Sequence, residues 1–447
     1  MLSEIISKLW YINGLSQSGD LMLTAFFFLI YNIVLLPILY MGIYTAALFN
    51  NKIRKGLIGR HFLFKELRKN NSVFFNKPVL VLHCASMGEF EHTKPFLMEF
   101  KKVKPEFKII VIFFSPSGYE NVKTFSVVDL FLYSPNEWIV SVWRFIRHLK
   151  PKVWVIAKHD VWPNQVWFCR FFKIPLFLIN ASLHTQSGRL SKISLSFYRS
   201  VYLSFMKVLT ISEDDSKNLL QIVPSDKLVV VGDTKYDQVI YRRDESQKKQ
   251  IISQSILKER WVFIAGSTWP ADHQYLFPTV MSLKAKFPGF LTIICPHEPS
   301  KQHLDEIYNQ ISANEFILLS DINNFKDESF IIIDRVGVLA NLYGLGKAAY
   351  VGGGFRQNVH NVLEAAVYKI PVIFGPVNHN SHEAQLLKKE RGGWEVSDSN
   401  EIEILLERFI LNDIYRQECG LRAYRIVELN RGATQKTVHH IISNLTS

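Results

Sequence analysis

Cysteine is scarce in this sequence, and its four residues lie far apart: Cys84, Cys169, Cys295 and Cys419. Because no two of them form a C-x-x-C pair, we expect neither a disulfide framework nor a cysteine-based metal site. Glycine and proline are not in excess, which excludes collagen-like and low-complexity chains. No repeat at solenoid periods is visible. A length of 447 residues therefore predicts a globular protein of about two or three domains.

Acidic residues are fewer than basic ones, so the net charge is +12 and the isoelectric point is near 9.3. This balance favours phosphates, anionic lipids or nucleic acid as partners. Helix-turn-helix, zinc-finger and ribonucleoprotein signatures are absent, and we expect no nucleic-acid partner. The histidines lack the spacing of a metal site, and the adjacent pair of His159 and Asp160 does not supply it. We therefore expect no metal and no cofactor.

The segment from residue 21 to residue 51 contains no Asp, Glu, Lys or Arg. It is long enough to cross about 30 Å of hydrocarbon as a helix, which Pro37 would kink but not forbid. Four basic residues follow at once: Lys52, Arg54, Lys55 and Arg60. This basic excess predicts that the carboxyl side is cytoplasmic. We predict a membrane-anchoring segment over residues 1–51 that spans the bilayer; a helix that lies in the interface is the main alternative.

After this stretch, apolar runs of strand length end in small, polar or glycine-rich turns. They lie at residues 79–86, 109–120, 153–160, 174–182, 208–212 and 228–233, and again at 261–268, 290–299, 316–321, 330–335, 348–354 and 370–376. Continuous apolar strands with helical stretches between them indicate parallel sheets covered on both faces. We predict two Rossmann-like doubly wound α/β domains, over residues 52–240 and 241–447, with ligands at the strand ends. A last helix, Asp413 to Leu429, is expected to pack across both halves.

The strongest local constellation is YVGGGFRQNVHNVLEAAVYKIPVIFGP, residues 350–376. Gly352 to Gly354 let the backbone approach a ligand closely. Asn361 lies near the amino end of a predicted helix, where free N–H groups favour phosphate. Glu364, one turn further, can accept hydrogen bonds from ribose hydroxyls. The alternative is a tight turn beside a solvated glutamate; the whole constellation favours nucleotide binding.

Glu89 follows a strand end in the stretch HCASMGEFE, where a Ser-x-Gly-Glu turn opens a helix. A carboxylate in this place can take a proton from an acceptor hydroxyl. From its own neighbours alone, Glu89 is better explained as a first-turn glutamate favoured by the helix dipole than as a catalytic base. Ser86 can cap the helix, and Glu91 is the competing carboxylate.

These stretches resemble the Kdo transferases, which attach 3-deoxy-D-manno-octulosonic acid (Kdo) to the lipid A precursor. The family segment G-G-H-N-x-L-E-x-A-A, followed by P-V-x-x-G-P, appears here as NVHNVLEAA and PVIFGP. Further stretches match in the family's order: HCASMGEFE, FFSPSGYE, VWPN, GDTKYD and AGSTWPADH. The resemblance implies the glycosyltransferase architecture called GT-B, two Rossmann-like domains with a cleft between them, working without a metal.

The resemblance also implies roles for single residues. Glu89 falls on the catalytic base, and Lys235 on the lysine that stabilises the transition state. Lys158, Asp160 and Ser86 fall in the transition-state and acceptor region. The implied nucleotide-binding positions are Ser267, Thr268, Pro296, His297, Val336, Gly337, Val338, Gly353, His360, Asn361, Val362, Leu363 and Glu364.

Several positions depart from the family's pattern. His297 stands where the family has an arginine that would grip a phosphate, and imidazole is a weaker, titratable donor. Val336 to Val338 replace a family M-G-E stretch, so only the glycine and backbone contacts survive. Lys158 reverses the charge of a family glutamate, while Asp160 keeps an acid; Ser182 replaces another arginine.

The resemblance therefore predicts an inverting glycosyltransferase that moves Kdo from CMP-Kdo to the lipid A precursor, lipid IVA, in lipopolysaccharide biosynthesis. It places the protein at the bacterial inner (cytoplasmic) membrane, with the catalytic domains facing the cytoplasm. Two alternatives stay open. One is a GT-B transferase or epimerase that uses a UDP-sugar; the other is a membrane-tethered nucleotide- or lipid-binding protein without activity.

Overall fold

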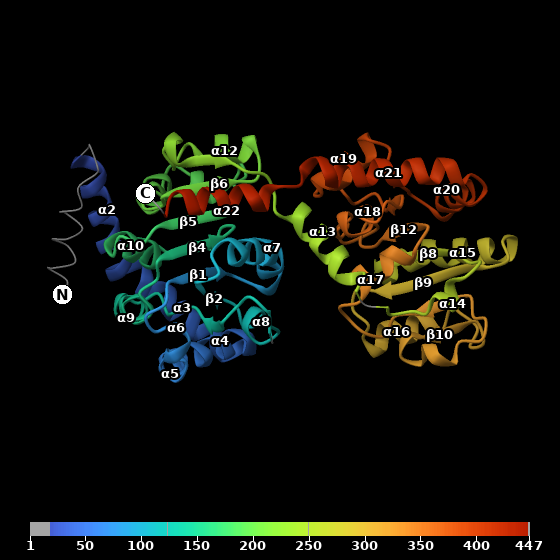
Figure 1. The fold of residues 1–447 in the computed structure, drawn as a ribbon, viewed down its shortest axis with the longest axis horizontal. Helices are drawn as coiled ribbons and strands as arrows, with labels where there is room; N and C mark the ends of the chain where they lie inside the picture. Colours follow the sequence, from blue (N-terminus) through green and yellow to red (C-terminus); the bar gives the residue numbers. More distant parts are fainter. Residues whose placement is uncertain (1–17, 123, 249, 446–447) are drawn as a thin grey trace. The chain divides into compact units, whose positions relative to one another are not determined.

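The computed structural model describes residues 18–122, 124–248 and 250–445 of the chain. Its contacts divide these residues into two compact units (Figure 1). The first domain holds the described residues up to Gln238 together with those from Arg431 onward, and the second domain is Val239–Asn430. Residues 1–17 of the predicted anchor lie outside the described residues.

The first domain contains a seven-stranded sheet in the order β3-β2-β1-β4-β5-β6-β7, and every pairing is parallel. Its strands are β1 (Val79–Cys84), β2 (Lys108–Phe113), β3 (Leu130–Tyr133), β4 (Val153–Ala157), β5 (Leu176–Ala181), β6 (Lys207–Thr210) and β7 (Leu228–Val230). The strand order reverses direction between β1 and β4. Open α/β sheets bind ligands at such a switch point, beyond the carboxyl ends of the strands.

Helices cover both faces of this sheet. They are α2 (Ser18–Ile30), α3 (Leu36–Phe49), α4 (Asn51–His61), α5 (Leu63–Lys69), α6 (Asn71–Phe74), α7 (Met87–Val103), α8 (Pro116–Tyr119), α9 (Ile139–Leu149), α10 (Pro163–Phe171), α11 (Leu195–Tyr202), α12 (Glu213–Leu219), α13 (Lys235–Ser246), which continues into the second domain, and α22 (Ala433–Ser443). Alternate strand residues serve opposite faces: Val79 and Val81 join one core cluster, and Leu80 and Leu82 the other. Both clusters are buried, as continuous apolar strands require.

The apolar amino-terminal segment is helical from Ser18 to Phe49, with a π-helical turn at Tyr31–Leu35 between α2 and α3. Met22–Phe49 is long and apolar enough to cross a membrane, and only 22% of its most apolar window is buried. A core helix of a water-soluble protein would be mostly buried, so this exposure sets the segment apart.

The second domain contains another seven-stranded parallel sheet, in the order β10-β11-β9-β8-β12-β13-β14. Its strands are β8 (Trp261–Thr268), β9 (Phe290–Pro296), β10 (Phe316–Leu318), β11 (Phe330–Ile332), β12 (Ala348–Val351), β13 (Val372–Phe374) and β14 (Gly393–Glu395). Here the switch point lies between β8 and β12. The carboxyl ends of these two strands carry the predicted Ser-Thr and glycine-rich turns.

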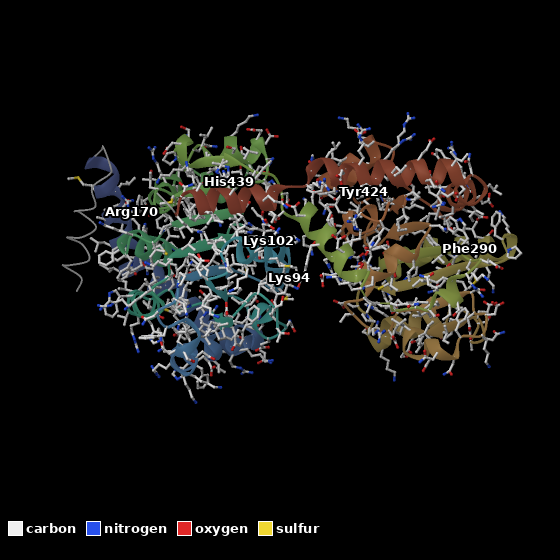
Figure 2. The ribbon with its side chains drawn as sticks, in the orientation of Figure 1. Lys94, Lys102, Arg170, Phe290, Tyr424 and His439 are labelled. Atoms are coloured by element: carbon white, nitrogen blue, oxygen red, sulfur yellow. The ribbon has the colours of Figure 1, made fainter. Side chains whose placement is uncertain are left out.

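The helices of the second domain are α14 (Gln254–Leu257), α15 (Pro270–Lys286), α16 (Lys301–Tyr308), α17 (Leu339–Leu342), α18 (Leu363–Ala366), α19 (His382–Lys389), α20 (Ser399–Leu411) and α21 (Asp413–Asn430). A buried cluster that includes Phe263, Leu283 and Leu406 joins α15 and α20 to the sheet. On α21, the ring of Tyr424 lies 5.0 Å from Lys369 Nζ (Figure 2).

The carboxyl terminus differs from the sequence prediction. The helix expected over Asp413 to Leu429, α21, belongs to the second domain alone, whereas residues from Arg431 onward return to the first. There α22 lies beside α7 and buries Val438 and Ile441 in the core of the first domain. Asp237 accepts hydrogen bonds from the backbone N–H groups of Gly432 and Thr434, both at 2.7 Å, and so holds the start of α22. The apolar face of α22 is the physical reason for the return.

Candidate functional site

Glu89 lies in the first turn of α7, directly after β1 and therefore at the switch point of the first sheet. Ser86 is the N-cap and accepts a long hydrogen bond of 3.5 Å from the Glu89 backbone N–H. The side chain turns back, so that Oε2 accepts from the Ala85 N–H at 2.6 Å. The residue is only 8% exposed. The turn therefore holds one carboxylate oxygen in place at the carboxyl end of β1.

Burial raises the pKa of Glu89 above its ordinary value, and the negative charge of Asp160 raises it further. The Ala85 N–H, His83 and Lys158 act in the opposite direction but do not cancel the rise. A carboxylate with a raised pKa binds a proton more strongly and is a better general base near neutral pH. The environment of Glu89 thus suits proton transfer.

Asp160 follows β4, the strand adjacent to β1, and faces a partner that sequence reasoning missed. Its Oδ2 lies 2.7 Å from Nε2 of His83, a fully buried residue on β1. Burial alone would raise the pKa of Asp160, but the hydrogen bond and the charge of His83 leave it lowered. Asp160 therefore stays ionised beside Glu89. The signal in the sequence is a single histidine inside the apolar strand VLVLHC.

Lys158 lies between β4 and Asp160 in a left-handed backbone conformation, with φ of +60°. Its N–H donates to the Ile179 carbonyl at 2.8 Å, which holds the turn. Non-glycine residues adopt this conformation at a cost of about 1 kcal/mol or more, and such strain gathers at functional turns. The structure therefore brings Lys158, Asp160 and Glu89 to one end of the first sheet.

Lys235 begins α13, after β7, and its Nζ lies 3.1 Å from Asp233 Oδ2. The preceding residue, Thr234, is buried and ties this turn to the rest of the domain. Its hydroxyl accepts from Asn180 Nδ2 at 2.6 Å and donates to the His92 carbonyl at 3.1 Å. The lysine is thus held on a braced turn, with its ammonium group paired to a carboxylate.

In the second domain, Ser267 and Thr268 end β8 and the glycine turn follows β12, the neighbouring strand. A Cβ atom on Gly352 would lie 2.2 Å from the Ser267 carbonyl oxygen, so no other residue fits there. Ser267 itself has a left-handed φ of +52°. The two turns are therefore locked together through their backbones.

Asp272 on α15 braces the glycine turn, and sequence reasoning did not select it. The fully buried carboxylate accepts from Tyr350 Oη at 2.7 Å, the Gly353 N–H at 2.9 Å and the Trp269 N–H at 2.8 Å. Burial raises its pKa. Because the Gly353 N–H is bonded to Asp272, this predicted nucleotide contact is not available as a donor in the structure.

Two imidazole rings and an indole form a stack beside these turns. His297 lies over His360 with ring centroids 4.2 Å apart and over Trp269 at 4.9 Å. Trp269 Nε1 donates to His360 Nε2 at 2.9 Å, and so makes that nitrogen the acceptor. Burial lowers the pKa of His360 to about 4, with the nearby His297 acting in the same direction. His360 is therefore neutral at physiological pH.

The predicted helix after Asn361 is much shorter than expected. It is one turn, Leu363–Ala366, because Lys369 takes a left-handed φ of +62° and Pro371 follows. Asn361 Oδ1 accepts from the Leu363 N–H at 3.2 Å, so its side chain closes the turn. A helix of this length has little dipole to offer a phosphate.

The other predicted nucleotide contacts differ in what they can offer a ligand. Glu364 Oε1 accepts from Arg242 Nη1 at 2.7 Å, so part of its carboxylate is already engaged. The side chains of Val362 and Leu363 are buried in the core and leave only backbone groups for a ligand. Pro296 ends β9 before His297. Of the stretch Val336 to Val338, the first side chain is 75% exposed, and Gly337 has a φ of +85°.

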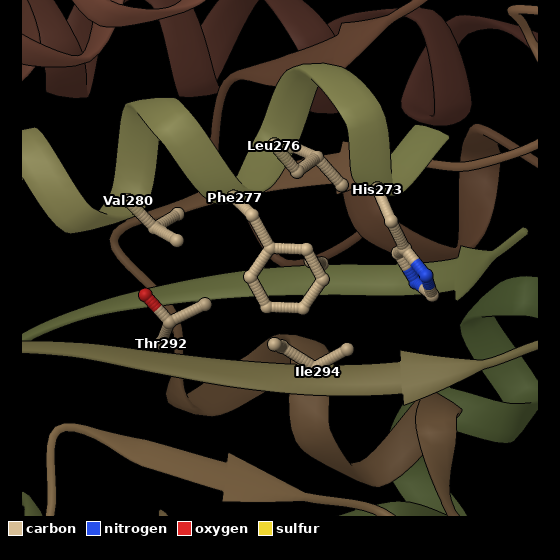
Figure 3. Close-up of a pocket in the computed structure, with 7 residues that line it drawn as sticks. His273, Leu276, Phe277, Val280, Thr292 and Ile294 are labelled. Atoms are coloured by element: carbon tan, nitrogen blue, oxygen red, sulfur yellow. The ribbon is translucent and has the colours of Figure 1, made fainter. Parts of the chain in front are cut away.

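A cavity beneath α15 is not this site. His273 and Phe277 on α15 face Thr292 and Ile294 on β9 across it (Figure 3). Its volume of about 10 Å³ has room for one water, far below the few hundred Å³ of a small-molecule site. Within the described residues, no three His, Cys, Asp or Glu side chains gather as a metal site would require. The strand ends remain the candidate site in each domain.

The first domain matches the family model described as 3-deoxy-D-manno-octulosonic-acid transferase, over residues 58–238. The 3-deoxy-D-manno-octulosonic acid transferase of Haemophilus influenzae is 28% identical over 366 residues, which cover 80% of this chain and 85% of that protein. Its counterpart from Aquifex aeolicus is 28% identical over 348 residues, covering 77% of this chain and 88% of that protein. The resemblance of this chain to the Kdo transferases is confirmed by these matches.

Solved structures share the fold. The UDP-GlcNAc 2-epimerase of Neisseria meningitidis, bound to UDP-GlcNAc, aligns with a TM-score of 0.57 at 17% identity and covers 82% of this chain and all of its own. The S. aureus MnaA–UDP structure aligns with a TM-score of 0.55 at 12% identity and covers 83% of this chain and 97% of its own. The prediction of two Rossmann-like domains of the GT-B type is confirmed.

Two positions where this chain differs from the Kdo transferase pattern lie together in the second domain. Trp269 stands where the family's S-T-H turn has its histidine, and His297 where it has an arginine; these two rings stack on one another. Their partner His360 occupies the family's own histidine position. An aromatic stack therefore lies where the family pattern has a histidine and an arginine.

Proposed function

We propose that this protein is an inverting glycosyltransferase that moves Kdo from CMP-Kdo to a lipid A precursor such as lipid IVA. The observation that carries the proposal is Glu89, a nearly buried carboxylate with a raised pKa at the switch point of the first sheet. The match to the Kdo transferase family model and the similarity to curated Kdo transferases support the donor class. The neighbouring Asp160 and Lys158 supply the charges of an acceptor region.

The proposed chemistry is a single displacement. Glu89 takes the proton of an acceptor hydroxyl, whose oxygen forms a bond to the anomeric carbon of Kdo. The bond from that carbon to the phosphate oxygen breaks, and CMP leaves with the electron pair. Lys235 offsets the negative charge that develops on the leaving group or on the donor carboxylate, an effect that grows where water is excluded. A single displacement inverts the anomeric configuration.

Donor binding is proposed for the second domain. Ser267 and Thr268, the glycine turn, and Asn361 with Glu364 would contact the nucleotide and phosphate, largely through backbone groups. His297 would contact the phosphate as a weaker donor than arginine. In this division of roles, the first domain handles the acceptor proton and the second holds the leaving nucleotide.

The proposed location is the bacterial inner membrane, with both domains in the cytoplasm. The apolar segment Met22–Phe49 is followed by Lys52, Arg54 and Lys55, which would lie near anionic lipid headgroups. Such attachment would keep the protein beside an acylated, phosphorylated acceptor.

The direct test is turnover by the full-length protein in detergent or vesicles, with CMP-Kdo and lipid IVA. We expect release of CMP together with a Kdo-bearing lipid whose anomeric configuration, read by NMR, is opposite to that of the donor. Thermal shift by CMP should exceed the shift by UDP. A larger shift by UDP would favour a UDP-sugar enzyme, and CMP binding without turnover would favour a binding protein; either result would overturn the proposal.

A further inference from the structure

The apolar amino-terminal helix packs along the surface of the first domain rather than projecting from it. Its buried side chains extend from Thr24 to Ala47, about 35 Å of helix at 1.5 Å per residue. Phe28 makes an edge contact with Trp167 of α10 at 5.5 Å, and Tyr40 lies 4.7 Å from Trp138 at the start of α9. The packed length therefore exceeds the thickness of the hydrocarbon core, about 30 Å.

Polar contacts hold the helix in this position. The side chains of Asn32 and Asn164 exchange two hydrogen bonds, at 3.0 and 2.7 Å. Tyr40 Oη accepts from the buried Glu137 N–H at 2.9 Å, and Asn164 Nδ2 also donates to the Glu137 carbonyl at 2.6 Å. Asn164 belongs to the W-P-N stretch. These contacts make the helix part of the domain and oppose its release as a separate membrane span.

The opposite face of the helix is apolar and exposed. Met22, Ile33, Met41 and Leu48 are 58%, 68%, 66% and 73% exposed, and the segment carries no charge. An exposed apolar stripe of this length is a membrane-contact surface or an aggregation site. The face that would meet lipid therefore runs along the whole helix.

The charges around the helix match an anionic lipid surface. A groove of about 260 Å³ between α5 and the carboxyl-terminal half of α9 is lined by Arg68, Arg144, Arg147 and His148. Among the described residues, none of these three arginines forms an ion pair with a carboxylate. Exposed cations on the same domain as an apolar stripe suit contact with an anionic lipid surface.

We propose that the helix Met22–Phe49 lies in the plane of the membrane, with one leaflet of the bilayer as its partner, instead of crossing it. A crossing helix that kept its contacts would carry α10 and α11 into the hydrocarbon, together with the exposed charges of Lys192 and Arg199. An in-plane helix keeps these charges in water and buries only the apolar stripe. This inference rests on the membrane attachment proposed above and adds its geometry.

A depth profile tests the proposal. Nitroxides would be attached to single-cysteine variants M22C, I33C, M41C and L48C of the full-length protein in vesicles. The native cysteines are buried, and the unsubstituted protein measures their background labelling. Equal, shallow depths of about 5–10 Å at all four positions are expected for an in-plane helix. A profile that is deepest at position 33 and shallow at both ends, or nitroxides in water, would overturn the proposal.

A second readout uses sidedness. Variants S18C and K52C flank the segment and would be treated with a membrane-impermeant maleimide in intact spheroplasts and in inside-out vesicles. Labelling of both from the cytoplasmic face is expected, whereas labelling from opposite faces means a crossing helix. Neither readout uses CMP-Kdo, so an inactive protein can still give the in-plane result and an active one can still refute it.

Discussion

The two domains share one architecture but carry different kinds of residue at the switch points of their sheets. In the first domain, the turns after β1 and β4 present ionisable side chains: Glu89, Asp160 and Lys158. In the second, the turns after β8 and β12 bring backbone groups close together, and the carboxylate of Asp272 is buried as a brace. A Rossmann-like sheet can therefore present either ionisable side chains or closely packed backbone groups, according to the residues at two strand ends.

The largest effect should come from removing the base. Glu89→Gln keeps the shape of the side chain but cannot take a proton, so the rate of CMP release should fall about 10²- to 10⁴-fold. The thermal shift caused by CMP, a property of the second domain, should stay the same. Glu91→Gln is the matched control, because Glu91 pairs with Lys94 at 2.5 Å on the same helix and should cost little activity. Equal losses in both variants would contradict the assignment.

The second-largest effect should come from a change in the glycine turn of the second domain. Gly352→Ala would place a Cβ atom 2.2 Å from the Ser267 carbonyl oxygen and must push the two turns apart. We expect CMP affinity, measured by isothermal titration, to fall at least about tenfold. Gly188→Ala is the control, since nothing lies within 4 Å of a Cβ atom there. Unchanged CMP binding in Gly352→Ala would show that the donor does not use this turn.

A pH profile should show the coupling within the first domain. As the proposed base, Glu89 should act only when deprotonated, so kcat/KM should fall as pH drops through its pKa, which burial and the negative charge of Asp160 raise. Asp160→Asn removes that charge and should move the acid limb of the kcat/KM profile to lower pH, whatever it does to the maximum rate. An acid limb that stays in place or moves to higher pH would separate Asp160 from the base.

The smallest effect concerns the aromatic stack. His297→Arg restores a permanent cation at the position where imidazole lies over His360. We expect CMP affinity to rise a few-fold and the rate with saturating donor to change little. Weaker binding would mean that the stack itself, rather than a missing charge, shapes the donor site in this protein.

Much of this comparison could be read from the sequence. Long apolar strands ending in small residues indicated both sheets, because burial on two faces leaves a continuous pattern. The edge strands β3 (Leu130–Tyr133) and β14 (Gly393–Glu395) were missed, and β14 has no continuous apolar run that could mark it. Their pairing depends on neighbours far away in the chain, which a local pattern does not contain.

The candidate sites were predictable in place but not in detail. Glu89, Lys158 and Asp160 were selected from the sequence. His83 was not, because its hydrogen bond to Asp160 joins residues 77 positions apart. Asp272 was overlooked because an acid in the first turn of a helix usually has a capping role, and only the fold brings Tyr350 to it. The helix after Asn361 was overestimated because its apolar residues serve a buried turn.

The return of α22 to the first domain determines which domain can be completed first during synthesis. The second domain is one continuous stretch and is complete once Asn430 has left the ribosome. The first domain must wait, because Val438 and Ile441 fill the core beside α7 only when the end of the chain emerges. During translation, the domain that is made first is therefore finished last, and its exposed α7 face must be shielded for the time that the ribosome needs to add about two hundred further residues.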